Sequence, residues 1–256
     1  MKILITGNRG FIGQNMTLAL AEHEITTYEW KDSAPIVRDL DWVIHLGAIS
    51  STTEQHVEKV LLQNYDFSKW LLNECNTYKV NFQYASSASI YGLHQVFTED
   101  SLVNPLSPYA WSKYLFERYV QENQWTNIVV QGFRYFNVYG PYEDHKGTQA
   151  SPHHQFDKQA REIGTITLFE GSDTFFRDFV PVTTLIDVHK AFFNVNESGI
   201  FNIGTGKVKS FKDIADVIAK KYNATIKYIP MPENIKYQYQ TYTKANLTKL
   251  KKYYKP

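Results

Sequence analysis

A glycine-rich turn near the start of the chain limits the possible folds more than any other feature. Residues 2–6 are a short apolar run, and Gly7, Gly10 and Gly13 follow it at intervals of three. Apolar residues at helical spacing then occupy 11–22. Glycine permits a tight turn and a close approach of backbone to phosphate, and the start of a helix attracts anions. The pattern therefore predicts a strand, turn and helix that bind the pyrophosphate of a dinucleotide.

Strands and helices alternate through the first half of the chain. We expect strands at 2–6, 25–29, 41–46, 81–86 and 127–132, with helices at 11–22, 55–79 and 107–125. This order predicts an α/β fold, a Rossmann-type doubly wound parallel sheet with helices on both faces. The stretch from 30 to 40 is too short to add another helix and strand.

The second half of the chain is less regular. We expect helices at 152–163, 184–195 and 210–222, and strands at 165–169, 200–203 and 225–229. The predicted organisation is a dinucleotide-binding domain over 1–150 and a smaller C-terminal substrate-binding lobe over 151–256. No linker separates the two, so we expect them to be interwoven.

Charge and cysteine content exclude several classes of protein. Lys and Arg number 27 against 26 Asp and Glu, which gives no electrostatic case for a nucleic-acid partner. No apolar run approaches the ~20 residues that span a bilayer, and the N-terminus does not resemble a signal peptide. The single cysteine, Cys75, fits a helix core and a reducing compartment. We expect a cytoplasmic protein without a membrane partner, and no metal site at His153-His154, which lack further ligands at metal-binding spacing.

The choice of dinucleotide depends on an acidic residue after the second strand. Glu29 lies 16 residues after Gly13, where a carboxylate would hold the adenine ribose and repel a 2′-phosphate, which favours NAD. Lys31 and Arg38 are close in the sequence and favour NADP instead. Alternatively, Glu29 is an ordinary surface charge with no role in binding. The sequence therefore does not decide between NAD and NADP.

A tyrosine and a lysine provide the main indication of hydride chemistry. Tyr109 and Lys113 are four residues apart, which places them on one face of the expected helix. Removing a proton from an alcohol requires a phenolate, whose ordinary pKa of about 10 must be lowered by positive charge such as Lys113 and an oxidised nicotinamide. Ser86 and Ser87 end the strand upstream and can orient the reacting oxygen. A Tyr-x-x-x-Lys pair alone is common, but with the glycine turn upstream it predicts a dehydrogenase-type site.

These residues together resemble the extended short-chain dehydrogenase/reductase superfamily, which acts on nucleotide sugars. Further segments resemble the ADP-L-glycero-D-manno-heptose 6-epimerases, and they lie at 47–54, 84–88, 132–141, 145–147, 168–172, 177–180, 201–206 and 239–243. The resemblance covers residues 7–250. Its most family-specific parts are His145-Lys146-Gly147 and the run from Ser50 to Glu54.

The resemblance implies an isomerase that inverts C6″ of ADP-glycero-manno-heptose for lipopolysaccharide core synthesis. A bound, recycled NADP or NAD would remove a hydride from C6″ and return it to the opposite face of the resulting carbonyl. Two faces require two proton-handling groups, which match Tyr109 and Lys146. Ser87 would hold the reacting oxygen, and Lys113 would hold the ribose and tune Tyr109. Taken alone, Lys146 also fits a solvated loop lysine.

The resemblance also implies two sets of binding residues. The cofactor set is Gly7, Gly10, Phe11, Ile12, Gly13, Glu29, Trp30, Asp39, Leu40, Leu46, Gly47, Ala48, Ile49, Ser50, Gln63, Lys113 and Val138. The substrate set is Ser50, Ser87, Asn137, Thr148, Phe169, Glu170, Gly171, Ser172, Arg177 and Tyr239. Within the second set, Arg177 suits the ADP pyrophosphate, because a guanidinium meets phosphate with two hydrogen bonds. An ion pair of Arg177 with Asp178 is the alternative.

The sequence departs from this family in several places. The 30–40 segment is shorter, Gln63 replaces a customary Asn, His154 or Gln155 falls where a substrate His is expected, and the final helix expected after Leu250 is missing. A homo-oligomer is expected from the family. Another nucleotide-sugar epimerase, such as a 4-epimerase, or a reductase stays open, whereas Ala88 and Ser89 replace the acid pair that a dehydratase needs. A non-catalytic dinucleotide-binding protein is a further alternative, although the intact Tyr109–Lys113 pair disfavours it.

Overall fold

A six-stranded parallel sheet forms the centre of the molecule. The computed structural model of the protein describes residues 1–30, 32–233 and 239–255. The strand order is β10-β5-β4-β3-β1-β2, made of β1 (Lys2–Thr6), β2 (Glu24–Tyr28), β3 (Trp42–His45), β4 (Asn81–Ser87), β5 (Val130–Tyr135) and β10 (Gly199–Ile203). The order reverses between β1 and β3, and in such sheets ligands bind outside the carboxyl ends of the strands at that point. The predicted doubly wound α/β sheet is confirmed.

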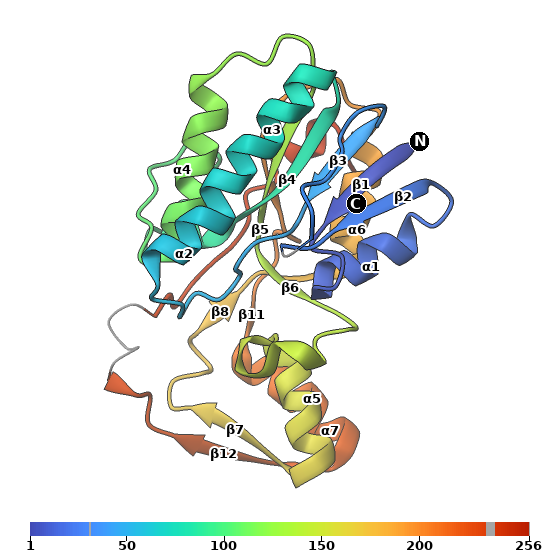
Figure 1. Ribbon diagram of the computed structural model, residues 1–256. Helices are drawn as coiled ribbons and strands as arrows, with labels where there is room; N and C mark the ends of the chain where they lie inside the picture. The colour runs from blue at the N-terminus through green and yellow to red at the C-terminus, as the bar shows by residue number, and fades with distance from the viewer. Residues whose placement is uncertain (31, 234–238, 256) are drawn as a thin grey trace.

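Helices cover both faces of this sheet (Figure 1). One face carries α1 (Phe11–Ala19) and α6 (Val182–Phe192), and the other carries α2 (Val57–Leu61), α3 (Phe67–Tyr78) and α4 (Pro108–Glu122). Successive side chains of a strand point to opposite faces. Accordingly Ile3 and Ile5 pack in one core with Met16 of α1, while Leu4 packs in the other with Leu71 of α3. None of the helices in the described residues is long and apolar enough to cross a membrane.

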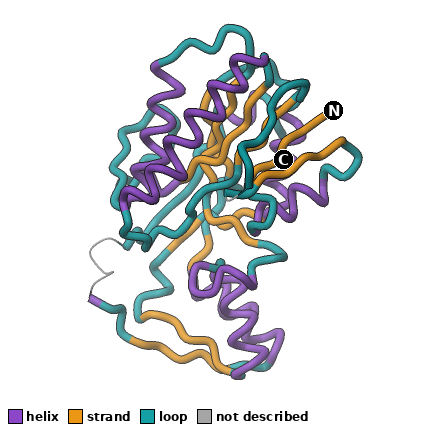
Figure 2. Tube along the Cα trace, viewed as in Figure 1, coloured by secondary structure: helices purple, strands orange, loops and turns teal. Residues whose placement is uncertain are grey.

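A smaller lobe lies beyond the carboxyl ends of the strands (Figure 1). It contains α5 (Pro152–Ile163), β7 (Thr165–Phe169), α7 (Phe211–Tyr222) and β12 (Thr225–Ile229), and β7 pairs with β12 in parallel. Phe156, Ile166 and Ile218 belong to its separate core. The central sheet and the helices on its two faces form a three-layer sandwich. Strands and loops connect the lobe to this sandwich (Figure 2), among them β6 (Asn137–Tyr139), β8 (Phe176–Arg177), β9 (Phe179–Pro181) and β11 (Lys209–Ser210). Because α6 and β10 belong to the sandwich, the chain returns to it after residue 150.

Two segments bear on the position of the site. No helix or strand occurs among the described residues between 30 and 40, as the length of this segment predicts, so β2 forms the edge of the sheet. The strand expected at 127–132 instead begins at Val130 and continues to Tyr135. It extends this far because Tyr135 pairs with Ser87 of β4 on one side and Ile203 of β10 on the other.

Tyr84 carries a hydroxyl that should destabilise the fold. Its side chain is buried in β4 against Gly132, and within the described residues the hydroxyl has no hydrogen-bond partner. An unsatisfied buried hydroxyl costs about 1–3 kcal/mol. Tyr84→Phe should therefore raise the free energy of unfolding by about 1 kcal/mol in urea denaturation. The control is Tyr91→Phe, which should lower stability because that hydroxyl donates to Asn202 Oδ1 at 2.8 Å. Equal losses in the two variants would contradict this interpretation.

Candidate active site

The glycine turn after β1 has the geometry that a phosphate requires. Gly7 has φ +72°, in the left-handed region, and an added Cβ there would lie 2.6 Å from Gly47 Cα. A Cβ at Gly13 would collide with the carbonyl of Gly7. Helix α1 begins directly after Gly10, which offers no side-chain cap, so the first N–H groups of the helix can serve a ligand. These features fit the pyrophosphate of a dinucleotide.

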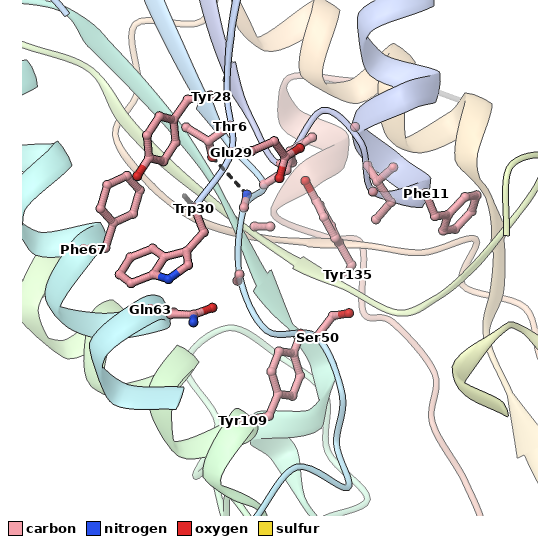
Figure 3. Close-up of a pocket in the computed structure, with 18 of the residues that line it drawn as sticks. Thr6, Phe11, Tyr28, Glu29, Trp30, Ser50, Gln63, Phe67, Tyr109 and Tyr135 are labelled. Atoms are coloured by element: carbon pink, nitrogen blue, oxygen red, sulfur yellow. Dashed lines mark hydrogen bonds between the residues drawn. The ribbon is translucent and has the colours of Figure 1, made fainter. Parts of the chain in front are cut away.

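A cavity of about 360 Å³ extends from this turn. Most of the residues expected to bind the cofactor line it, namely Gly7, Gly10, Phe11, Ile12, Gly13, Glu29, Trp30, Leu46, Gly47, Ala48, Ser50, Gln63 and Lys113. Figure 3 shows Glu29 and Trp30 toward one end and Tyr109 with Ser50 at the other. Lys146 lines the same cavity. The proposed proton-transfer residues and the phosphate turn therefore share one space.

Four residues expected in this set lie elsewhere. Asp39 adopts φ +63° in a turn, and Leu40 packs against the core beneath α3 and α4. The backbone N–H and carbonyl of Ile49 are both bonded to the side chain of Asn64. Val138 packs against the core beneath α1 and α6. None of these four residues lines the cavity.

Sequence reasoning missed an aromatic wall at the Glu29 end of the cavity. Tyr28 stacks on Phe67 with ring centroids 5.1 Å apart, and Trp30 meets Phe67 edge-on at 5.6 Å (Figure 3). A π-helical turn, η1 (Leu62–Asp66), precedes Phe67 and turns Gln63 toward the cavity. Such a wall suits a flat base. The other lining residues that the sequence did not single out are Thr6, Ala85 and Tyr135, whereas Ser86 and His145, which it did name, also line the cavity.

The Tyr109–Lys113 pair lies on α4, whose first turn is capped by the hydroxyl of Ser107. Lys113 Nζ is 5.9 Å from the centre of the Tyr109 ring. Burial raises the pKa of Tyr109, and hydrogen bonding with Ser87 acts in the opposite direction. Burial also lowers the pKa of Lys113 to about 8, against the effect of Glu117. The expected lowering of the Tyr109 pKa by Lys113 is therefore not achieved by the protein alone, because burial dominates.

Lys146 lies in the cavity wall and not in bulk solvent. Its side chain is 23% exposed, and Nζ lies 5.1 Å from the centre of the Phe11 ring and 3.8 Å from Glu143 Oε2. Burial lowers the pKa of this amine, while Glu143 raises it. A lowered pKa brings a lysine closer to the range in which it can accept a proton. The structure thus disfavours a solvated loop lysine.

A second cavity, of about 720 Å³, is lined from both the sandwich and the smaller lobe. Five residues expected to bind substrate line it, namely Thr148, Phe169, Ser172, Arg177 and Tyr239. The hydroxyl of Ser172 is buried and has no partner within the described part of the chain, so it is free for a ligand. Ser89 lines this cavity too, and its hydroxyl is unpartnered in the same sense.

Arg177 is buried in the wall of this second cavity without a carboxylate partner among its hydrogen bonds in the described residues. Its guanidinium lies 5.3 Å from the Tyr239 ring and 5.4 Å from the Phe211 ring, and it donates to backbone carbonyls. Burial lowers the pKa of Arg177. The alternative ion pair is not formed, because Asp178 accepts hydrogen bonds from Thr205 and from the neighbouring backbone instead. Arg177 is therefore available to an anion.

The remaining expected substrate residues line neither cavity, apart from Ser50, which lines the first. Ser87 ends β4 and contacts Tyr109, and Asn137 is held in β6, where it pairs with Phe179. Glu170 and Gly171 form a turn, with Gly171 at φ +80°.

Two further expectations concern the choice of dinucleotide and a metal. Lys31, which would favour NADP, lies outside the described residues. Among those described, no group of three or more His, Cys, Asp or Glu is placed to hold a metal ion.

Comparison with known proteins assigns the family. A model of the NAD dependent epimerase/dehydratase family matches residues 32–204. The chain belongs to this family. Similar solved structures include an ADP-L-glycero-D-manno-heptose-6-epimerase from Helicobacter pylori, with 26% identity, a TM-score of 0.84 and coverage of 97% of this chain and 88% of that one.

Two further structures share the fold of this family member. One is a UDP-N-acetylglucosamine 4-epimerase from Methanobrevibacter ruminantium in complex with UDP-N-acetylmuramic acid, at 21% identity and a TM-score of 0.91, covering 100% of this chain and 92% of that one. The other is a UDP-glucose 4-epimerase from Thermus thermophilus in complex with NAD, at 23% identity and a TM-score of 0.82, covering 98% and 92%. The neighbours thus include epimerases of different sugars.

Proposed function

We propose that the protein is a nucleotide-sugar epimerase that inverts a stereocentre by moving a hydride to a bound nicotinamide dinucleotide and back. One observation carries the proposal: Tyr109, Lys113 and Lys146 line the same cavity as the glycine turn. A non-catalytic dinucleotide-binding protein has no need for two proton-transfer groups in one cavity. The bound dinucleotide supplies the acceptor and donor of the hydride.

The protein's own residues handle the proton. Tyr109, as phenolate, takes the proton from the sugar hydroxyl of one epimer while Ser87 hydrogen-bonds to the reacting oxygen. Lys113 stabilises the phenolate from its place one helical turn away. When the carbonyl presents its other face, the Lys146 ammonium gives a proton to the oxygen, and in the reverse direction the neutral amine removes one. Proton exchange with water then returns Tyr109 to the phenolate and Lys146 to the ammonium for the next turnover. Burial of Lys146 supports this role, because a lowered pKa makes the ammonium a readier proton donor and makes the neutral amine more available as an acceptor.

The substrate that we propose is ADP-glycero-manno-heptose, inverted at C6″. The second cavity supplies Arg177 for the pyrophosphate and the unpartnered hydroxyl of Ser172 for a polar group of the substrate. The motif His145-Lys146-Gly147 and the likeness to the Helicobacter pylori enzyme support heptose. The likeness to two 4-epimerases supports the second candidate, inversion at C4″ of a UDP-hexose.

A substrate panel tests the proposal. The purified protein, with NAD added, is incubated separately with ADP-D-glycero-D-manno-heptose, UDP-glucose and UDP-N-acetylglucosamine, and each product is identified by NMR. Conversion of the heptose to its 6″ epimer is expected. Conversion of only a UDP-sugar would support the second candidate, and conversion of none, with the dinucleotide bound, would contradict both.

We further propose that the dinucleotide is NAD. Glu29 Oε1 accepts a hydrogen bond from the N–H of Arg9 in the glycine turn at 2.7 Å, which holds a carboxylate beside the expected ribose position. The negative charge of the Glu29 carboxylate would repel the 2′-phosphate of NADP. Arg38 lies elsewhere, with its guanidinium 5.3 Å from the Tyr78 ring.

Glu29→Ala should therefore reduce the preference for NAD over NADP by about tenfold, since removal of a like charge relieves repulsion. Dissociation constants of both dinucleotides, from quenching of tryptophan fluorescence, would measure the ratio. Glu24→Ala at the other end of β2 is the control and should leave the ratio in place. A ratio that Glu29→Ala does not change would contradict the assignment.

A further inference from the structure

Glu143 is a buried carboxylate that joins three parts of the structure. Its Oε1 accepts hydrogen bonds from the N–H of Gly140 at 3.1 Å and from the hydroxyl of Ser151 at 2.7 Å. Its Oε2 accepts from the N–H of Ser151 at 2.6 Å. Gly140 follows β6 and Ser151 caps the start of α5. The carboxylate therefore fixes both ends of the intervening loop, which contains the 3₁₀ segment η3 (Asp144–Gln149) with Lys146.

The same carboxylate faces the amine of Lys146. Nζ lies 3.8 Å from Glu143 Oε2, and the three-residue spacing of the pair suits a 3₁₀ turn, in which side chains three apart lie above one another. An opposite charge at this distance favours the charged form of the amine, whereas burial favours the neutral form. The protonation of Lys146 thus depends on a balance between Glu143 and burial.

We infer that Glu143 is a positioning residue that holds the Lys146 amine at the wall of the dinucleotide cavity and sets how readily it exchanges a proton. The inference rests on the proposed function, in which Lys146 is the second proton-transfer group. Glu143 lines neither cavity, so it acts through Lys146 and not on the sugar. Substitution of Glu143 should shift the pH at which Lys146 changes its protonation state, whereas a loss of packing alone would not.

Other titratable groups surround this pair and must be considered. Burial lowers the pKa of His153 of α5 to about 4, so this neighbour of Glu143 is neutral near pH 7. The titratable side chains that line the cavity with Lys146, taken over the described residues, are Tyr28, Glu29, Tyr109, Lys113, Tyr135 and His145. Glu143 is the group that raises the pKa of Lys146, through its negative charge.

The test measures the protonation of Lys146 without any sugar. The intact protein is labelled briefly with trace acetic anhydride at a series of pH values, and mass spectrometry quantifies acetylation of Lys146, which requires the neutral amine. In Glu143→Gln the midpoint should move down by about one pH unit, so labelling below the midpoint should rise about tenfold. Asp144→Asn removes a neighbouring, exposed carboxylate, which faces His154, and is the matched control expected to leave the midpoint in place.

Epimerisation gives the second readout. The pH profile of kcat/KM is the same in both directions, because epimerisation takes up and releases no net proton, and the limb of this profile that Lys146 sets should move to lower pH in Glu143→Gln. Glu143→Asp keeps the charge and should restore most of the wild-type midpoint. It also decides the matter if Glu143→Gln does not fold, because a midpoint in Glu143→Asp equal to that of an exposed lysine overturns the inference.

Two other results would also overturn it. One is an unchanged midpoint in folded Glu143→Gln, and the other is a shifted midpoint with an unchanged pH profile of epimerisation. Failure of the proposed function is distinguishable, because it would appear as a lack of turnover by the wild-type protein with every sugar of the panel, whatever the labelling result.

Discussion

Tyr109→Phe should lower the turnover number for epimerisation about a thousandfold. The variant keeps the ring on α4 and removes the hydroxyl that we propose as the base for one epimer, so the packing at the glycine turn should persist. Binding of the dinucleotide, measured by quenching of tryptophan fluorescence, should change less than about twofold, because the pyrophosphate and ribose contacts come from other residues.

A tyrosine elsewhere on the same helix gives the control for this variant. Tyr114→Phe makes the same chemical change outside both cavities and should retain nearly full turnover. Comparable losses in the two variants would indicate a defect in α4 and not in chemistry. Full turnover by Tyr109→Phe would eliminate the phenol as a proton-transfer group.

Lys146→Met should reduce interconversion of the epimers by about a hundredfold or more, yet leave one half of the reaction intact. Methionine matches the length of the lysine stem without its charge, so it can pack beside Phe11. Tyr109 would still take the proton from its own epimer. Reduction of added dinucleotide by that epimer, followed by absorbance, should therefore persist while the inverted product fails to form.

The control for this second prediction is the same substitution at Lys158, an exposed lysine of α5. Lys158→Met should epimerise at the wild-type rate. If Lys146→Met interconverts both epimers at the wild-type rate, the two-group mechanism is wrong. If neither half of the reaction survives in it while Lys158→Met is normal, Lys146 serves binding in both directions.

Local patterns allowed much of the fold and site to be predicted. The glycine turn and the Tyr109–Lys113 pair each lie within one or two helical turns, so spacing alone defines their geometry. The strand at Asn137 could not be predicted in this way, because it exists through pairing with Phe179, far along the chain. Glu143 was missed for the same reason, since its partner Ser151 becomes significant only when the loop closes.

The cofactor positions that differ from the prediction have a physical explanation too. Asp39 and Leu40 belong to the cofactor set that the resemblance implies, but Leu40 packs against the core beneath α3 and neither residue lines the cavity. The aromatic wall of Tyr28, Trp30 and Phe67 occupies that end of the cavity instead. Phe67 lies four residues after Gln63, and that spacing within an expected helix was the available signal.

The fate of the hydride tests the central claim most directly. ADP-D-glycero-D-manno-heptose carrying deuterium at C6″ is converted by the protein with NAD in ordinary water, and the epimer formed is analysed by NMR and mass spectrometry. Our account predicts that the deuterium is retained at C6″ of the inverted product, since it leaves and returns as hydride within one active site. Replacement of that deuterium by hydrogen from water would show that the carbon loses a proton instead, and would contradict the account.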